Sequence, residues 1–153
     1  MPATIHEVDT SSRGPLEAKG VRMDRAPDTV GEMMTRDVVT VDPDHPVKSA
    51  IRAMVERDIG SVVVVEDGMA IGVFTERDLT LRLLDESGLL ERRMREVMSS
   101  PPVVTGPDTE VVEAFDMMNA RRIRRLPIVK SNRLVGIVTE RDLLRWVGQV
   151  ARE

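Results

Sequence analysis

The segment Gly72-Val73-Phe74-Thr75-Glu76-Arg77-Asp78-Leu79 occurs a second time as Gly136-Ile137-Val138-Thr139-Glu140-Arg141-Asp142-Leu143. Six of the eight positions are identical at an offset of 64 residues. The same offset aligns further identical pairs outside the segment, among them Met34 with Met98, Pro43 with Pro107, Val47 with Val111, Ala50 with Ala114 and Met54 with Met118. Matches at one fixed spacing over this length indicate a tandem repeat.

Each repeat has the same predicted order of elements: a short strand, a helix, two strands joined by a hairpin, and a last helix. The expected strands are Val38–Val41, Ser61–Val65 and Ala70–Phe74 in the first repeat, and Val103–Thr105, Leu126–Val129 and Leu134–Val138 in the second. Apolar residues at helical spacing predict helices beginning at Val47 and Val111. The final helices should begin at Thr75 and Thr139, and Leu89–Val97 is also expected to be helical.

One repeat has too few elements to bury its own apolar faces, so we expect the two repeats to pack together. The predicted fold is therefore α/β, with two βαββα-type repeats related by a pseudo-twofold axis. We expect a flexible polar arm over residues 1–27, the first repeat over 28–88 and the second repeat with its C-terminal helix over 89–153.

The amino-acid composition limits the classes of function that are open to this chain. Apolar residues make up 41% of the 153 residues but aromatics only 2%, so the core must be aliphatic. There is no Cys and only two His, which excludes thiolate catalysis and disfavours a histidine-rich metal site. The net charge of −4 makes nucleic acid an improbable partner, and no apolar run is long enough to cross a membrane. We expect a cytoplasmic protein without enzymatic activity.

The pattern resembles the CBS domain pair, or Bateman module, from Thr29 to Val147. The resemblance is carried by Met34-Thr35 and Met98-Ser99, by the Val-Val-Thr segments, and by Gly-x-x-Thr-x-x-Asp in both repeats. It implies a stand-alone regulatory sensor that binds AMP, ADP, ATP or S-adenosylmethionine, with no cofactor required. It also implies a homodimer and an unidentified client protein.

The residues that would contact a nucleotide fall into three groups. The ribose should be held by Asp78 or Asp142, with Thr75 or Thr139 nearby, because a carboxylate accepts hydrogen bonds from vicinal hydroxyls. The phosphates require cations, and the resemblance points to Arg124 and Arg125. Adenine should occupy an apolar slot formed near Val39, Thr40, Val104 and Thr105.

Each assignment has a structural alternative. The Thr-x-x-Asp spacing is close to a capping box, which would explain Thr75 and Asp78 without a ligand. The arginines around residues 121–125 could form a solvated face or salt bridges in a dimer. Gly60 and Ser61 replace Arg124 and Arg125 in the first repeat, so the two clefts should differ. The chain as a whole could be a structural dimerisation module with empty or vestigial clefts.

Overall fold

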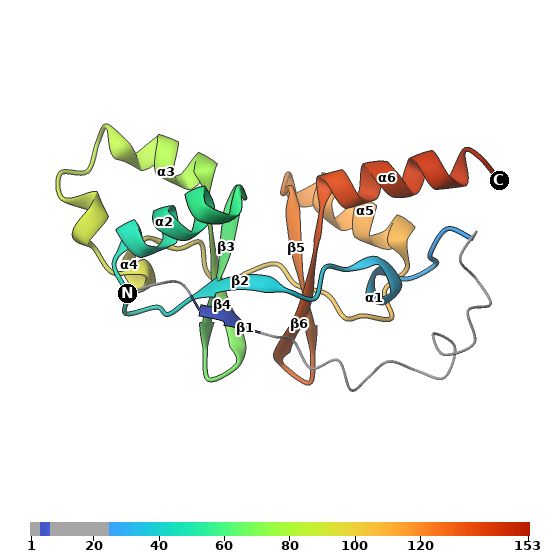
Figure 1. The fold of residues 1–153 in the computed structure, drawn as a ribbon, viewed down its shortest axis with the longest axis horizontal. Helices are drawn as coiled ribbons and strands as arrows, with labels where there is room; N and C mark the ends of the chain where they lie inside the picture. The colour runs from blue at the N-terminus through green and yellow to red at the C-terminus, as the bar shows by residue number, and fades with distance from the viewer. Residues whose placement is uncertain (1–3, 7–24) are drawn as a thin grey trace.

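The computed structural model describes residues 4–6 and 25–153 as two halves that lie side by side (Figure 1). The elements in chain order are β1 (Thr4–His6), α1 (Val30–Met33), β2 (Val38–Val41), α2 (Val47–Arg57), β3 (Ser61–Glu66), β4 (Met69–Thr75), α3 (Glu76–Leu83), a 3₁₀ turn (Leu89–Glu91), α4 (Met94–Val97), α5 (Val111–Arg121), β5 (Arg125–Lys130), β6 (Arg133–Thr139) and α6 (Glu140–Val150). The predicted α/β fold of two packed repeats is confirmed.

Each of the two sheets contains an antiparallel hairpin of the same kind. Strands β3 and β4 pair antiparallel, as do β5 and β6. Both turns place two residues at positive φ, Asp67 and Gly68 in the first and Ser131 and Asn132 in the second. Two consecutive left-handed residues match the twist of antiparallel strands, which is why these short polar segments close hairpins.

Most of the N-terminal arm expected over residues 1–27 lies outside the described residues. Contrary to that expectation, Thr4–His6 form β1, which pairs antiparallel with β2 and completes the sheet order β1-β2-β3-β4. Strand β2 pairs with β3 on its other side, so without β1 its backbone N–H and C=O groups would form an open edge. At the end of the arm, the Trp146 indole donates a hydrogen bond of 2.6 Å to the Pro27 carbonyl.

The short helices α1 and α4 each pack against the half formed by the other repeat. Val30 of α1 is fully buried among α5, β5, β6 and α6, and Met94 and Val97 of α4 are buried among α2, β3 and β4. Backbone pairing continues the exchange, because Thr35 bridges Ile137 and Ser99 bridges Val73. Each half of the molecule therefore needs a segment from both repeats.

The sheets face one another across an aliphatic interface. Val38 and Val63 are buried there. They pack against partly buried side chains of both hairpins, namely Val65 and Ala70 of the first and Leu134, Val135 and Ile137 of the second. The Leu134 amide also donates to the Gly68 carbonyl at 3.1 Å, which links the two hairpin ends directly. Packing at this interface removes from water the apolar sheet faces that neither repeat could cover alone.

Two expected elements are wrong. The strand at Val103–Thr105 is reduced to one parallel bridge between Thr105 and Ile128, because Pro127 stands at the position of Val63 and has no N–H to extend the ladder. The helix expected over Leu89–Val97 is broken at Arg92 and Arg93, whose backbone is extended.

The break at Arg92 and Arg93 is compensated by tertiary hydrogen bonds. Val47 donates to the Arg92 carbonyl at 2.8 Å, and Met94 donates to the His45 carbonyl at 2.9 Å. The Arg95 side chain forms ion pairs with Glu66 and Asp44, and these hydrogen bonds raise its pKa above the usual value. Pairing with the loop before α2 thus overrides local helix propensity in this segment.

Enlarging Gly136 should destabilise the exchanged packing. A Cβ at Gly136 would lie 2.7 Å from Met34 Cγ and 3.1 Å from Met34 Cβ, and the equivalent space at Gly72 is filled by Met98. We expect Gly136→Val and Gly72→Val each to lower the free energy of unfolding by about 1–3 kcal/mol, as overpacking does, measured by urea denaturation. Gly148→Ala in α6 is the control, because no atom lies within 4 Å of the added Cβ. Loss of stability in the control but not at Gly136 would contradict this packing.

Candidate functional site

Both Thr-x-x-Asp segments form complete capping boxes at the starts of α3 and α6. The Thr75 hydroxyl accepts from the Asp78 amide at 3.2 Å, and Asp78 Oδ2 accepts from the Thr75 amide at 2.9 Å. The Thr139 and Asp142 pair repeats this geometry, with 3.3 Å and 2.8 Å. In both, Oδ2 also accepts from the threonine hydroxyl at 3.0 Å. The cap therefore occupies Oδ2 and leaves Oδ1 without a hydrogen-bond partner among the described residues.

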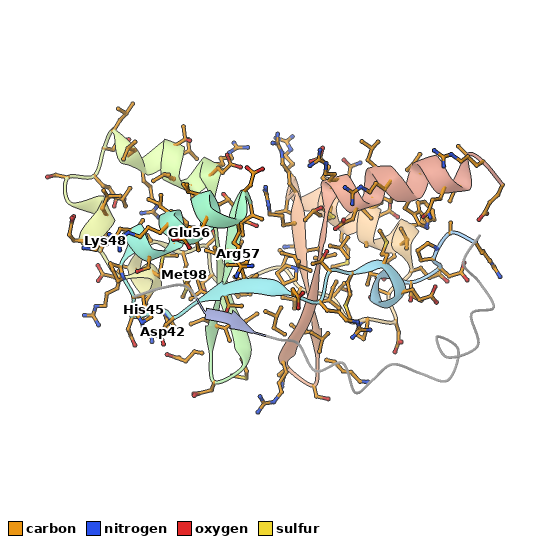
Figure 2. The ribbon with its side chains drawn as sticks, viewed as in Figure 1. Asp42, His45, Lys48, Glu56, Arg57 and Met98 are labelled. Atoms are coloured by element: carbon orange, nitrogen blue, oxygen red, sulfur yellow. The ribbon has the colours of Figure 1, made fainter. Side chains whose placement is uncertain are left out.

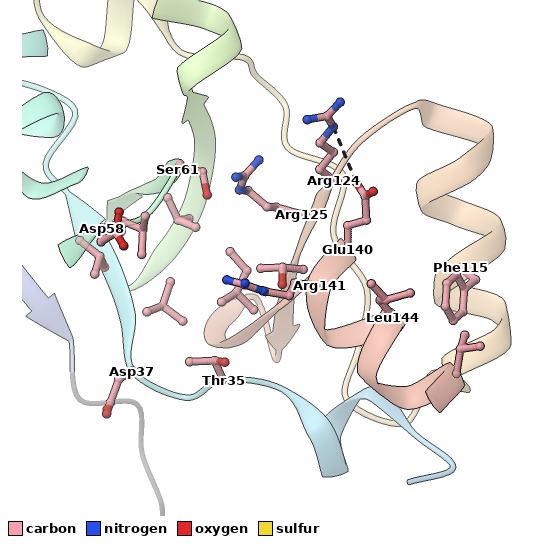
Figure 3. Close-up of a pocket in the computed structure, with 18 residues that line it drawn as sticks. Thr35, Asp37, Asp58, Ser61, Phe115, Arg124, Arg125, Glu140, Arg141 and Leu144 are labelled. Atoms are coloured by element: carbon pink, nitrogen blue, oxygen red, sulfur yellow. Dashed lines mark ion pairs between the residues drawn. The ribbon is translucent and has the colours of Figure 1, made fainter. Parts of the chain in front are cut away.

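A cleft of about 740 Å³ lies between the two repeats, next to the start of α6 (Figure 3). Its volume is within the range typical of small-molecule sites. The first repeat contributes Thr35, Asp37, Val38, Val39, Asp58, Ile59, Gly60, Ser61 and Val63, and the second contributes Phe115, Arg124, Arg125, Ile137, Thr139, Glu140, Arg141, Leu144 and Val147. Neither repeat could form this cleft by itself.

Three arginines of the cleft differ in their surroundings. Arg124 is largely exposed and lies 3.6 Å from Glu140 at the rim, an ion pair that solvent weakens. Figure 3 shows Arg125 and Arg141 extending into the space between the repeats. Neither Arg125 nor Arg141 has an ion-pair partner within the part of the chain that the structure describes. Asp37 and Asp58 lie on the opposite side, so positive charge is confined to the α6 side of the cleft.

The family model for the CBS domain matches residues 30–85 and again residues 94–149. The chain belongs to the CBS domain family. The second match begins at Met94, so α4 belongs to the second CBS motif although it packs in the first half of the molecule. The exchange of α1 and α4 is thus an exchange between CBS motifs.

Curated relatives share the CBS pair and differ in their total length. The CBS domain-containing protein YhcV of Bacillus subtilis is 37% identical over 82% of this chain and 88% of its own length. An uncharacterized protein of Methanopyrus kandleri is 41% identical over 76% of this chain, which spans 61% of that relative. Inosine-5'-monophosphate dehydrogenase of Methanocaldococcus jannaschii is 36% identical over 80% of this chain, but this chain spans only 24% of the enzyme.

Solved CBS pairs have the same fold. The CBS-domain-containing protein of Agrobacterium tumefaciens superposes with a TM-score of 0.73 at 28% identity, over 82% of this chain and 96% of that one. The CBS domain pair of a Methanocaldococcus jannaschii protein was solved with 5'-methylthioadenosine and S-adenosyl-L-methionine. It also gives a TM-score of 0.73, at 22% identity over 83% of this chain and all of that one, so this likeness is one of fold.

The ten predicted ligand residues divide into groups. Val39, Arg124, Arg125 and Thr139 line the cleft, and Asp142 adjoins it through its bonds to Thr139. Thr75, Asp78, Val104 and Thr105 lie outside it, and at the offset of 64 residues only Thr75 has a repeat equivalent, Thr139, that lines the cleft. The Thr105 hydroxyl contacts the Thr109 hydroxyl at 2.6 Å. Thr40 is 1% exposed on β2 and also lies outside the cleft.

Arg141 and the apolar lining of the cleft other than Val39 were not predicted from the sequence. Arg141 lies inside the repeated Thr-Glu-Arg-Asp segment, directly before Asp142, so the repeat itself was a signal for it. Ile59, Phe115 and Leu144 carried no comparable signal, because an apolar side chain in a helix or before a strand is normally read as part of the core. Their place in the cleft follows only from the packing of the repeats.

The loop before α2 supports the fold through its backbone. Figure 2 places His45 and Asp42 at the loop before α2, on the side of repeat one that is away from repeat two. The His45 amide donates to the Asp42 carbonyl at 3.2 Å, and the His45 carbonyl accepts from Met94, which fixes α4. Within residues 4–6 and 25–153, no three His, Cys, Asp or Glu side chains gather in a way that could hold a metal ion. Over the same residues, no helix has the length and apolar character needed to span a bilayer.

Removal of either capping carboxylate should cost a similar amount of stability. Because the two boxes have nearly equal geometry, we expect Asp78→Ala and Asp142→Ala each to lower the free energy of unfolding by about 1 kcal/mol. Urea denaturation of both variants in ligand-free buffer measures this. A loss of several kcal/mol in one variant only would contradict the equivalence of the caps.

Proposed function

We propose that this CBS pair is a regulatory module that binds an adenosine-containing nucleotide in the cleft between its repeats. The observation that carries the proposal is the Thr139–Asp142 cap beside a cleft that also holds Arg125 and Arg141. A carboxylate that can accept hydrogen bonds from hydroxyls matches the ribose, two guanidinium groups match the phosphates, and the apolar lining of the cleft matches the base of a nucleotide.

Ribose recognition is assigned to Asp142 and Thr139. The cap holds Oδ2 of Asp142 and thereby fixes the direction of Oδ1, which can accept hydrogen bonds from the vicinal hydroxyls. Structural and ligand-binding roles are therefore compatible in the same carboxylate. Val39, Ile59 and Ile137 supply apolar surface for the adenine ring.

Phosphates are assigned to the arginines on the α6 side. Arg125 and Arg141 extend into the cleft, and Arg124 stands at its rim beside Glu140. Guanidinium groups suit phosphate because they offer several planar donors with a fixed charge. AMP, ADP, ATP and S-adenosylmethionine all fit this donor set in part, and the adenosine compounds bound to a CBS pair of the same fold support the class.

A second, pseudo-twofold-related site belongs to the same proposal. Thr75 and Asp78 would hold ribose there, with Val104 and Thr105 near the base. The two sites have unlike arginine supplies because Gly60 and Ser61 stand where the second repeat has Arg124 and Arg125. Unequal affinity for phosphates follows from that difference.

Regulation requires that the nucleotide bind two states of the module unequally. A ligand in this cleft contacts both repeats, so it would favour one spacing of the two halves and alter the surface presented to a client protein. We assign the module no catalysis of its own, and place it in the cytoplasm, where adenine nucleotides are available.

The module is further proposed to form a homodimer through α3 and α6. Large apolar side chains are exposed on and just after these helices, including Leu81 at 62%, Leu84 at 92% and Leu144 at 70%. Val147 and Val150 extend the same kind of surface along α6. Exposed apolar side chains on two neighbouring turns of a helix, such as Leu144 and Val147, are typical of an interaction site.

Nucleotide binding is tested by titration calorimetry with adenosine, AMP, ATP and S-adenosylmethionine. We expect Asp142→Ala to weaken every adenosine ligand in this cleft by roughly tenfold to one-hundredfold, because hydrogen bonds to a charged acceptor are lost. Asp78→Ala should weaken binding at the second proposed site instead, and Glu91→Ala, which removes a carboxylate outside both proposed sites, is the control. No binding of any of the four compounds by the unmodified protein would favour a structural module with empty clefts.

The phosphate assignment predicts a selective effect. Arg141→Gln should weaken ATP roughly fivefold to tenfold, because a charge-assisted hydrogen bond is lost, and should leave adenosine nearly unchanged. Arg52→Gln is the control, because Arg52 is exposed on α2 and does not line the cleft. Equal losses for ATP and adenosine would remove Arg141 from phosphate binding.

The dimer is tested by sedimentation. Leu84→Lys combined with Leu144→Lys should shift the protein from a dimer to a monomer, since a charge at an apolar interface is costly to bury. The control is Met69→Lys in the β3–β4 hairpin, another exposed apolar residue that lies on neither helix. An unmodified protein that sediments as a monomer at high micromolar concentration would contradict the homodimer.

A further inference from the structure

The two repeats satisfy the first glutamate of their last helix in different ways. In the second repeat, Glu140 lies 3.6 Å from Arg124 of the same repeat. The equivalent residue in the first repeat is Glu76, and the position equivalent to Arg124 is Gly60. Glu76 therefore has no arginine of its own repeat at this place.

Arg125 of the second repeat fills the space that Gly60 leaves open. A Cβ at position 60 would overlap both Glu76 Oε1 and Arg125 Nη2, so the carboxylate and the guanidinium lie close together over this glycine. Figure 3 shows Arg125 reaching from β5 toward the Ser61 side of the cleft. The structure records no direct ion pair between Glu76 and Arg125, and neither side chain has another charged partner among the described residues.

From this juxtaposition we infer that Glu76 competes with ligand phosphate for Arg125 and so determines how strongly the cleft prefers phosphorylated ligands. The inference rests on the proposed function and deepens it. A phosphate in the cleft would draw Arg125 away from Glu76, because the phosphate and the carboxylate attract the same guanidinium group. Opposite charges interact appreciably when they are partly shielded from water. Glu76 begins α3, the helix that Thr75 caps and that contains Asp78, so the same movement would couple the cleft to the second proposed site.

The chemistry of the competition is electrostatic and needs no bond change. Each ligand phosphate competes with one carboxylate, that of Glu76, for the guanidinium group of Arg125. Glu140 makes the same competition for Arg124, but at an exposed rim where solvent screens it. Arg125 is half-buried, so solvent screens its attraction to Glu76 less than it screens the attraction between Arg124 and Glu140.

The test compares affinities of Glu76→Gln for adenosine, AMP and ATP by titration calorimetry. We expect AMP and ATP to bind about threefold to tenfold more tightly, which is the size of a partly screened charge pair, and adenosine to bind as before. Glu91→Gln, an equal change of net charge in the exposed 3₁₀ turn, should alter none of the three. An unchanged ATP affinity in Glu76→Gln, or an equal gain for adenosine, would overturn the inference.

A double-mutant cycle with Arg125→Gln shows whether Glu76 acts through this arginine. In the Arg125→Gln background, Glu76→Gln should no longer tighten ATP binding; a gain that persists would mean that Glu76 repels the phosphate directly and would overturn the competition. The same four proteins are compared without nucleotide by urea denaturation. We expect the effects of the two substitutions on the urea midpoint of unfolding to be non-additive. Additive midpoints would overturn the pairing itself. If no nucleotide binds but the midpoints are coupled, the proposed function fails while the pairing stands.

Discussion

The exchange of α1 and α4 between the two CBS motifs is the constraint on which the rest of the structure depends. Each helix is too short to be stable alone, and each has its buried side chains in the opposite half. Separating the repeats would expose both cores at once. The exchange also brings Thr35 onto β6, so that Val38 and Val39 of the first repeat come to lie beside the start of α6. The cleft between the repeats is a consequence of this packing.

Local structure was predictable wherever residues close in the chain determine it. The hairpins followed from short polar turns between apolar runs, and the caps followed from Thr and Asp at a spacing of three. The exchange was not predictable, because an apolar face at helical spacing shows that a helix is buried but not against which partner. The broken helix at Arg92 and the strand lost opposite Pro127 have the same origin. In both places, the hydrogen bonds that decide the backbone come from segments distant in the sequence.

The candidate site was predictable only in part. Thr139 and Asp142 stand in a segment that occurs twice, and the resemblance to the CBS pair pointed to Arg124 and Arg125. The apolar lining gave no such signal, since Phe115 and Leu144 have the spacing of ordinary helix residues. Arg141 was not predicted, because the phosphate contacts were assigned to Arg124 and Arg125. Capping and ligand binding are not exclusive, as the single occupied oxygen of Asp142 shows.

Divergence between the repeats is informative because the backbone at the diverging positions is the same. The Gly60 carbonyl accepts from the Glu76 amide at 3.0 Å, and the Arg124 carbonyl accepts from the Glu140 amide at 2.8 Å. These bonds tie each last helix to its hairpin whatever side chain is present, so the fold does not require arginine at position 124 or glycine at position 60. A side chain that the fold does not require is free to serve the cleft. Gly60 then makes room for Arg125 beside Glu76, whereas Arg124 neutralises Glu140. Two copies of one unit thus differ in the charge of the side chains at this place, while the backbone hydrogen bonds beside them are the same.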